Sequence, residues 1–261
     1  MIYNLSSLTI ALELFACMIV ACEIGHWLGK RLKKEVGLAY QGQIDSVQSS
    51  LLGILALLIA FTFSIALQRF ESRNDAVVDE ANAIGTAFLR TQLLPKQAQP
   101  EIQQTMRQYV DLRARASQLA LNNATERDPL LQQATMTQDK LWQQTMQLVP
   151  ANATPVTYGL FIQSLNEMID SFGRRTAVIS RHVPEAVLGL LAIVFTMTSW
   201  VIGFNAGIAQ PRVSKITYLK IFLVALLVYA ILDLDHPRQG MIQVDQTPLL
   251  DLQRSIHNKT D

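Results

Sequence analysis

A few carboxylate and histidine side chains are the residues of this 261-residue chain that could do chemistry. Asp233, Asp235 and His236 are metal-ligand types, but they form one short cluster, whereas zinc sites draw on wider patterns. The simpler interpretation is a helix that ends in a turn. The sequence also lacks phosphate-binding loops, nucleophile elbows and paired-cysteine motifs, so we expect no enzyme, no cofactor and no metal site.

Carboxylates recur at helical spacing in a second place. Asp75 and Asp79 share one predicted helix face, and Glu80 lies beside it. In an oligomer these three residues would form a carboxylate ring near a pore mouth, which favours cations or holds a divalent ion. A solvated face, or an ion pair between subunits with Arg73 or Arg90, explains the same spacing.

The segment that precedes these carboxylates has one small, polar face. By three- and four-residue spacing this face contains Ser46, Ser50, Gly53, Leu57, Ala60, Ser64 and Gln68. Such a face either lines a pore or allows close helix packing, because small residues are enriched where membrane helices touch. The pore-lining candidates are Ser50, Gly53, Leu57, Ser64 and Gln68.

An apolar stripe runs beside the small face and consists of Ile54, Leu58, Phe61 and Ile65. Rings of such side chains would form a hydrophobic constriction that gates a pore by dewetting. A lipid-facing or core surface is the alternative. The candidates for a neck are Ile54, Phe61 and Ile65.

Glu13 lies inside the first apolar block of the chain. Ionisable residues within a membrane are costly and often functional. Glu13 is therefore protonated, bonded to a neighbouring helix, or closer to the interface than its place in the block indicates. Glu23 and His26, three residues apart near the end of the same block, are expected to have a paired structural role.

The elements that position these residues are predicted from the distribution of charge. Charged residues make up 16% of the chain and hydrophobic residues 50%, whereas soluble domains have about 25% charged residues. Four apolar blocks cover 5–28, 51–67, 186–204 and 216–232, each about long enough to cross a hydrocarbon core of about 30 Å as a helix. We predict an all-α integral membrane protein with four transmembrane helices.

Residues 68–183 are polar and are predicted to form a helical-bundle domain inserted between the second and third transmembrane helices. Helices are expected at 68–93, 101–122, 129–149 and 155–182, and the first should continue the membrane helix because no Gly or Pro interrupts 54–82. Asp128 and Pro129 are expected as the N-cap and first residue of the third helix. The predicted organisation is therefore 5–67 with a basic loop at 29–46, the domain 68–183, a membrane segment 184–232, and a tail 233–261.

Two helix faces of the inserted domain are expected to pack on neighbouring helices. The first face comprises Leu131, Ala134, Gln138, Leu141, Thr145 and Leu148. The second comprises Tyr158, Phe161, Leu165, Met168, Phe172 and Ile179.

Basic residues in short loops indicate the cytoplasmic side of a membrane. The loops 29–46 and 207–215 contain Lys30, Arg31, Lys33, Lys34, Arg212 and Lys215, whereas the first seven residues contain no Lys or Arg. We therefore expect both loops in the cytoplasm, and both termini and the 68–183 domain in the periplasm, of a protein in a bacterial inner membrane.

The stretch 50–90, SLLGILALLIAFTFSIALQRFESRNDAVVDEANAIGTAFLR, resembles the signature of bacterial bestrophin-like membrane proteins. The segment 233–253, DLDHPRQGMIQVDQTPLLDLQ, is similar to the closing motif of that family. The resemblance implies a distant relation to bestrophins, pentameric anion channels with four membrane helices per subunit and a hydrophobic neck on the second. It also implies that Phe61 and Ile65 belong to the neck, and that the large helical part is cytosolic, opposite to the orientation that the basic loops indicate.

Two functions follow from these observations. The first is an oligomeric, bestrophin-like ion channel or channel-like protein whose second transmembrane helix lines the pore. The alternative is a membrane-anchored sensor or scaffold whose extramembrane helical domain binds a partner. The net charge of +1 indicates no nucleic-acid partner, so the expected partners are the lipid bilayer, further copies of the chain and permeant ions.

Overall fold

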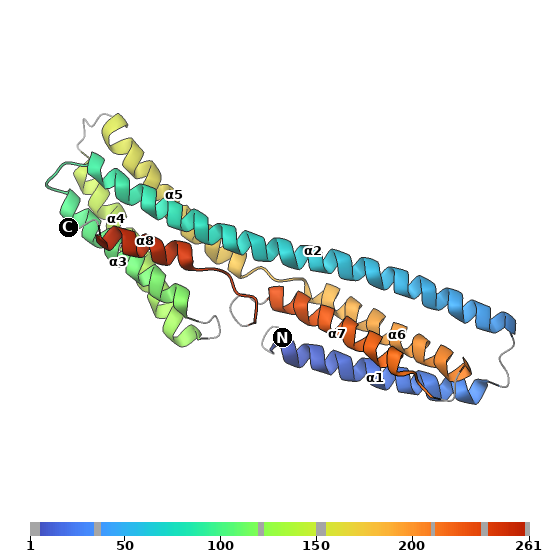
Figure 1. Ribbon diagram of the computed structural model, residues 1–261. Coiled ribbons are helices and arrows are strands. Elements are labelled where there is room, and N and C mark those ends of the chain that lie inside the picture. Colours follow the sequence, from blue (N-terminus) through green and yellow to red (C-terminus); the bar gives the residue numbers. More distant parts are fainter. Residues whose placement is uncertain are drawn as a thin grey trace. The chain divides into compact units, whose positions relative to one another are not determined.

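The computed structural model describes residues 6–33, 38–119, 123–149, 155–209, 212–235 and 240–258, whose regular structure is helical with no strand among them (Figure 1). The helices are α1 (Ser7–Leu32), α2 (Leu38–Arg90), the short 3-10 helix η2 (Thr91–Leu93), α3 (Gln99–Gln118), α4 (Ala124–Leu148), α5 (Pro155–Ile179), α6 (Glu185–Ala209), α7 (Lys215–Asp235) and α8 (Thr247–Asn258). The all-helical fold confirms the prediction from periodicity.

The chain divides into two compact units that share α2. Unit 1 comprises Met1–Arg69 and His182–His236, and unit 2 comprises Phe70–Arg181 and Pro237–Asp261. Unit 1 therefore contains α1, the first part of α2, α6 and α7, while unit 2 contains the remaining helices.

Four helices of the described chain are long and apolar enough to cross a membrane, as the four apolar blocks predicted. They are α1, α2, α6 and α7. The second helix begins much earlier than the predicted residue 51, so the segment between α1 and α2 is shorter than the predicted loop 29–46. The residues before 51 are polar, and within this helical stretch the hydroxyls of Ser49 and Ser50 are satisfied locally by donating to the carbonyls of Asp45 and Ser46, one turn earlier.

Glycines hold α1 and α6 together in unit 1, where Figure 1 shows these two helices side by side. A Cβ atom at Gly203 would collide with the carbonyl of Cys22 and would lie 2.8 Å from its Cα. The same holds at Gly25 and Gly207, where a Cβ would lie 2.9 Å from a backbone nitrogen of the other helix. The two backbones therefore touch directly, which is how small residues stabilise membrane helix pairs.

Unit 2 has one apolar core, to which α2, α3, α4, α5 and α8 all contribute. Its fully buried members include Ile84, Tyr109, Leu141, Leu165 and Leu249. The predicted packing faces are confirmed: Ala134, Gln138, Leu141 and Thr145 of α4 and Phe161, Leu165 and Met168 of α5 are buried.

The predicted start of α4 is wrong. The helix begins at Ala124, with Asn123 at the N-cap, and Pro129 lies inside it rather than at its first position. Proline lacks one backbone N–H, so near the beginning of a helix it removes a single hydrogen bond and the helix continues. The 233–261 region, expected as a tail, also contains α8, whose Leu249 and Ile256 are buried in the core of unit 2.

Candidate functional site

The small face of α2 is exposed in unit 1. All seven residues of this face are exposed: Ser46, Ser50, Gly53, Leu57, Ala60, Ser64 and Gln68. No atom outside the local helix lies within 4 Å of the position that a Cβ on Gly53 would occupy. Within a single chain, therefore, this face is not the close helix contact that its small residues allow.

The neck candidates lie on the same exposed side of α2. The exposed fractions are 50% for Ile54, 56% for Leu57 and 60% for Phe61, and Ile65 is exposed to 37%. Exposed apolar side chains on this scale require a non-aqueous or self-complementary environment, which means lipid or another subunit.

The opposite face of α2 is the one that packs within unit 1. Leu55, Thr62 and Ala66 are buried there. Leu55 belongs to a cluster with Met18 of α1 and Phe195 of α6, and the Thr62 hydroxyl donates to the carbonyl of Leu58 at 2.7 Å. One side of α2 thus packs against other helices of the same chain. The opposite side can contact lipid, solvent or another subunit.

The polar stripe continues along α2 in unit 2. Asp75 and Asp79 are exposed, and they line two neighbouring grooves of about 220 and 440 Å³ between α2 and α5. Arg174 lines both grooves and pairs with Glu167 on the same helix. The two aspartates are therefore surface carboxylates in a single chain, and their place at a pore mouth stays a prediction.

Glu80 does not fit the predicted pore mouth. Its side chain is fully buried, and its carboxylate accepts hydrogen bonds from Arg113 Nε at 2.6 Å and Arg113 Nη2 at 3.0 Å. Arg175 Nη1 donates to Glu80 Oε2, the oxygen that also accepts from Arg113 Nη2. We call this group the buried ion cluster. Glu80 is therefore a structural residue of the core of unit 2.

The electrostatics of the buried ion cluster keep Glu80 ionised. Burial alone raises the pKa of the Glu80 carboxyl, but the charges and hydrogen bonds of Arg113 and Arg175 outweigh it, so the pKa lies below its usual value. Burial also raises the pKa of the neighbouring Tyr109 hydroxyl, which accepts a hydrogen bond from Gln138 Nε2 at 2.9 Å.

The sequence contained a signal for this cluster. Arg113 continues the spacing of Ile102, Met106 and Tyr109, all buried on one face of α3. A charged residue on an apolar helix face is rarely buried unless it is paired. The sequence alone did not identify the partner, because Glu80 lies 33 residues from Arg113 and 95 from Arg175.

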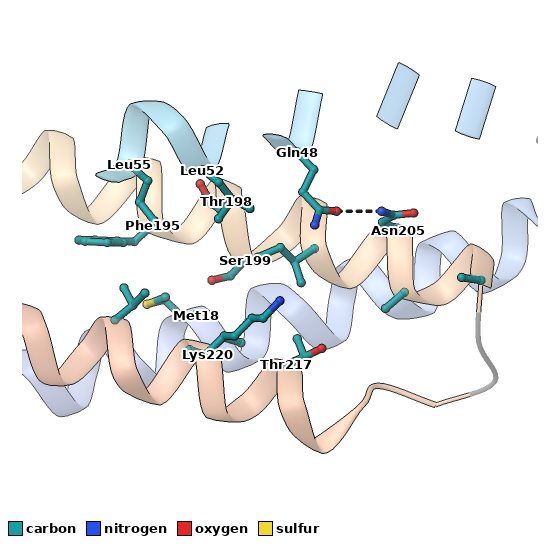
Figure 2. A pocket seen from close by; sticks show the side chains of 15 residues that line it. Met18, Gln48, Leu52, Leu55, Phe195, Thr198, Ser199, Asn205, Thr217 and Lys220 are labelled. Atoms are coloured by element: carbon teal, nitrogen blue, oxygen red, sulfur yellow. Dashed lines mark hydrogen bonds between the residues drawn. The ribbon is translucent and has the colours of Figure 1, made fainter. Parts of the chain in front are cut away.

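Unit 1 also holds a largely apolar cavity of about 280 Å³, with a few polar side chains in its lining, that sequence reasoning missed. Figure 2 shows Lys220 of α7 extending its ammonium group toward Ser199 and Asn205 of α6. Asn205 Nδ2 donates to Gln48 Oε1 at 2.8 Å and to Asp45 Oδ1 at 2.7 Å, which links α6 to α2. The arrangement offers one positive charge with hydroxyl and amide groups in a membrane segment, where polar groups often serve function.

The remaining ionisable candidates have local roles. Glu13 is exposed and is the seventh residue of α1, so it lies about 9 Å along the helix from its start, which places it closer to a helix end than its block indicated. Glu23 accepts a hydrogen bond from the Tyr218 hydroxyl rather than pairing with His26.

Asp235 acts as a structural carboxylate within unit 1. Its Oδ2 accepts a hydrogen bond from the backbone N–H of Val183 at 2.9 Å and lies 3.7 Å from His182 Nδ1. His236, the third member of the predicted cluster, lies outside the described residues. Among the residues that the structure describes, no group of three or more metal-ligating side chains occurs.

Comparisons with known proteins place this arrangement in a family. A crystal structure of a bacterial bestrophin homologue from Klebsiella pneumoniae matches with a TM-score of 0.63 at 18% identity, covering 97% of this chain and 98% of that chain. A second structure of a bacterial bestrophin homologue from the same organism, solved by Zn-SAD phasing, matches with a TM-score of 0.58 at 17% identity, covering 96% and 97% of the two chains. No curated protein matches the sequence. The family model of the bestrophin-like domain matches residues 16–249, and the chain, a channel-like membrane protein with four apolar helices, therefore belongs to the bestrophin-like family.

Proposed function

We propose that this chain is one subunit of a homo-oligomeric ion channel in which α2 lines the pore. The observation that carries the proposal is the exposed small face of α2, which runs from Ser50 to Gln68 without a contact partner at Gly53. A ring of subunits would bring copies of this face around one axis. Five subunits are the number that the family resemblance implies.

The neck of the proposed pore consists of Phe61 and Ile65, with Leu57 and Ile54 on the adjoining turns. Phe61 is the most exposed of these side chains, at 60%. Rings of apolar side chains exclude water when the passage is narrow and thereby block ions until the passage widens.

The mouth of the proposed pore carries Asp75 and Asp79, whose carboxylates are exposed in unit 2. Rings of carboxylates favour cations. The proposed channel therefore prefers cations at this mouth. Glu80 is not part of the ring because Arg113 and Arg175 bind its carboxylate.

Ion flux through purified protein in liposomes tests the pore. Phe61→Ala widens the proposed neck and is expected to raise the flux severalfold. Phe63→Ala is the matched control, since Phe63 lies on the same helix, is less exposed at 38%, and falls outside the small face and the apolar stripe. Equal flux in both variants would overturn the neck, and no flux across salts and voltages would favour the sensor or scaffold function.

Disulfide crosslinking tests the oligomer. The background requires Cys17→Ser and Cys22→Ala, because both cysteines are free. Ser64→Cys places a thiol on the small face, and it is expected to form disulfide-linked dimers on oxidation. Leu226→Cys, an exposed position on α7, is the matched control and should crosslink far less. Equal crosslinking at the two positions contradicts an axis on α2.

The proposed location is a bacterial inner membrane with unit 2 in the periplasm. The basic residues Lys30 and Arg31 in the last turn of α1 support a cytoplasmic end there. In the same cysteine-free background, an impermeant thiol reagent added to intact cells is expected to label Asn123→Cys and not Lys33→Cys. The reverse result would establish the orientation implied by the bestrophin resemblance.

A further inference from the structure

A second cavity lies in unit 2, beside the buried ion cluster. Its volume is about 200 Å³, and residues of α3, α4 and α5 line it. The polar lining residues are Arg113, Arg127, Arg175, Ser117, Thr176 and Ser180. Since one water has a share of about 30 Å³ of liquid volume, the cavity has room for a small polyatomic ligand.

The charges around this cavity do not balance. Arg113 and Arg175 are both buried and, among the residues that the structure describes, share one carboxylate, that of Glu80, which leaves one excess positive charge in this group. Arg127, the third guanidinium, pairs with Asp128 at 2.9 Å and so adds no net charge. An uncompensated buried charge is unfavourable, which means that a bound anion would stabilise the protein.

The hydrogen bonds of Arg175 are also incomplete. Its Nη1 donates to Glu80 and its Nη2 to Gln246 Oε1. Its Nε is buried, and among the described residues it has no hydrogen-bond partner. The excess charge and this unsatisfied donor therefore belong to the same buried residue, and that residue lines the cavity.

We propose that the cavity binds a small oxyanion, such as phosphate or a small carboxylate, next to Arg175. The guanidinium groups of Arg175 and Arg127 supply charge-assisted donors, which are the strongest hydrogen bonds to such groups. The hydroxyls of Ser117 and Thr176 donate to carbonyls in their own helices, and the hydroxyl of Ser180 donates to the carbonyl of Ala177 in the last turn of α5. Each hydroxyl can rotate to donate to a ligand instead. This site is separate from the proposed pore.

Thermal unfolding of the full-length protein in detergent, with inorganic phosphate titrated at constant ionic strength set by a bulky sulfonate salt, tests the site. A ligand that binds only the folded state raises the melting temperature, and we expect a saturable rise of about 2–8 °C. Acetate is expected to give a smaller saturable rise. Chloride is titrated as the third anion. A rise in melting temperature with chloride alone, or no rise with phosphate, acetate or chloride, would overturn the proposal.

Two variants tie the response to this cavity. Ser180→Asp supplies a carboxylate from an exposed lining position, so it should melt higher without phosphate and lose the response to phosphate. Ala177→Asp is the matched control, because it adds the same charge at an exposed position on α5 that does not line the cavity, and it should keep the response. Equal phosphate responses in the two variants would show that phosphate binds elsewhere and would overturn the site.

Calorimetric titration of phosphate into Arg127→Gln gives an independent readout. The Arg127 side chain is partly exposed, and its ion-pair partner Asp128 is exposed too, so the variant should fold. Its affinity for phosphate is expected to fall about tenfold, because charge-assisted hydrogen bonds contribute on that scale. An unchanged affinity would contradict the assigned site.

Discussion

The two halves of α2 use one continuous helix in opposite ways. Over 51–67 the helix has no charged residue, and its small face is exposed. Over 70–90 it carries charges, and two of them, Arg73 and Glu80, are almost completely buried. In the 70–90 half the protein's own helices surround α2, and charged side chains are buried there. In the 51–67 half lipid or another subunit surrounds part of α2, and apolar side chains are exposed from the single chain there. Exposure of an apolar residue is therefore informative only once the surrounding medium is known.

The pair α1 and α6 sharpens the comparison, because it uses small residues for contact within the chain. Gly25, Gly203 and Gly207 bring two backbones together, whereas Gly53 on α2 meets nothing. The same residue type thus marks an internal contact in one place and an unoccupied face in the other. That difference is why we propose that the small face of α2 lines a pore in the oligomer.

The largest effect is expected from Glu80→Gln, which tests the buried half of α2. The change leaves Arg113 and Arg175 buried without their carboxylate. Breaking a buried ion pair in this way destabilises proteins by about 3–5 kcal/mol. Chemical or thermal unfolding of the detergent-solubilised protein measures this loss in the free energy of unfolding.

The matched control for that change is Glu167→Gln. Glu167 pairs with Arg174, but both side chains are more than half exposed. Exposed pairs contribute about 0–1 kcal/mol. Similar losses in the two variants would mean that the buried ion cluster is not the stabilising feature of unit 2.

Acid is expected to weaken the same half of α2. The pKa of Glu80 in the folded protein lies below its ordinary value of 4.5, so the folded state binds fewer protons than the unfolded state. The stability that Glu80 contributes is then fully present above pH 4.5 and is lost as the pH falls through its folded pKa. The free energy of unfolding, measured between pH 7 and pH 3, should fall more steeply in the wild type than in Glu80→Gln. Parallel curves would contradict the assignment.

A smaller loss is expected from Gly203→Ala at the contact between α1 and α6. The added Cβ would meet the backbone of Cys22, and overpacking of this kind costs about 1–3 kcal/mol. Gly53→Ala is the control on the exposed face. It should leave stability unchanged or raise it by up to about 1 kcal/mol, since Ala favours helix more than Gly. Equal losses of stability in Gly203→Ala and Gly53→Ala would contradict the distinction between the α1–α6 contact and the exposed small face of α2.

The sequence was sufficient for features that depend on local composition. Uncharged windows predicted the four membrane-length helices, and the absence of Gly and Pro over 54–82 predicted the continuity of α2. Periodic apolar residues predicted the buried faces of α4 and α5, including Leu141 and Leu165.

The features that the sequence did not reveal depend on contacts between distant segments. Glu80 looks like a neighbour of the polar stripe, and only the packing of α3 and α5 around it identifies it as buried. The helix α8 is short, and its apolar residues Leu249, Leu252 and Ile256 can be recognised as a packing face only against the core of unit 2. The cavity around Lys220 likewise requires side chains from α1, α2, α6 and α7 together.

The smallest effect on stability is expected from the double change Asp75→Asn and Asp79→Asn, which bears on what the exposed stripe of α2 does. Both side chains are exposed, and surface substitutions of this kind usually change stability by no more than about 0.5 kcal/mol. If the stripe lies at a pore mouth, however, the loss of two carboxylates per subunit should reduce the preference for cations severalfold. Reversal potentials of purified protein in bilayers under a salt gradient measure that preference. Glu126→Gln and Asp139→Asn remove the same charge from exposed positions on α4, away from the stripe, so a shift in the first variant alone identifies the stripe as the surface that ions pass, and equal shifts would reduce it to general surface charge.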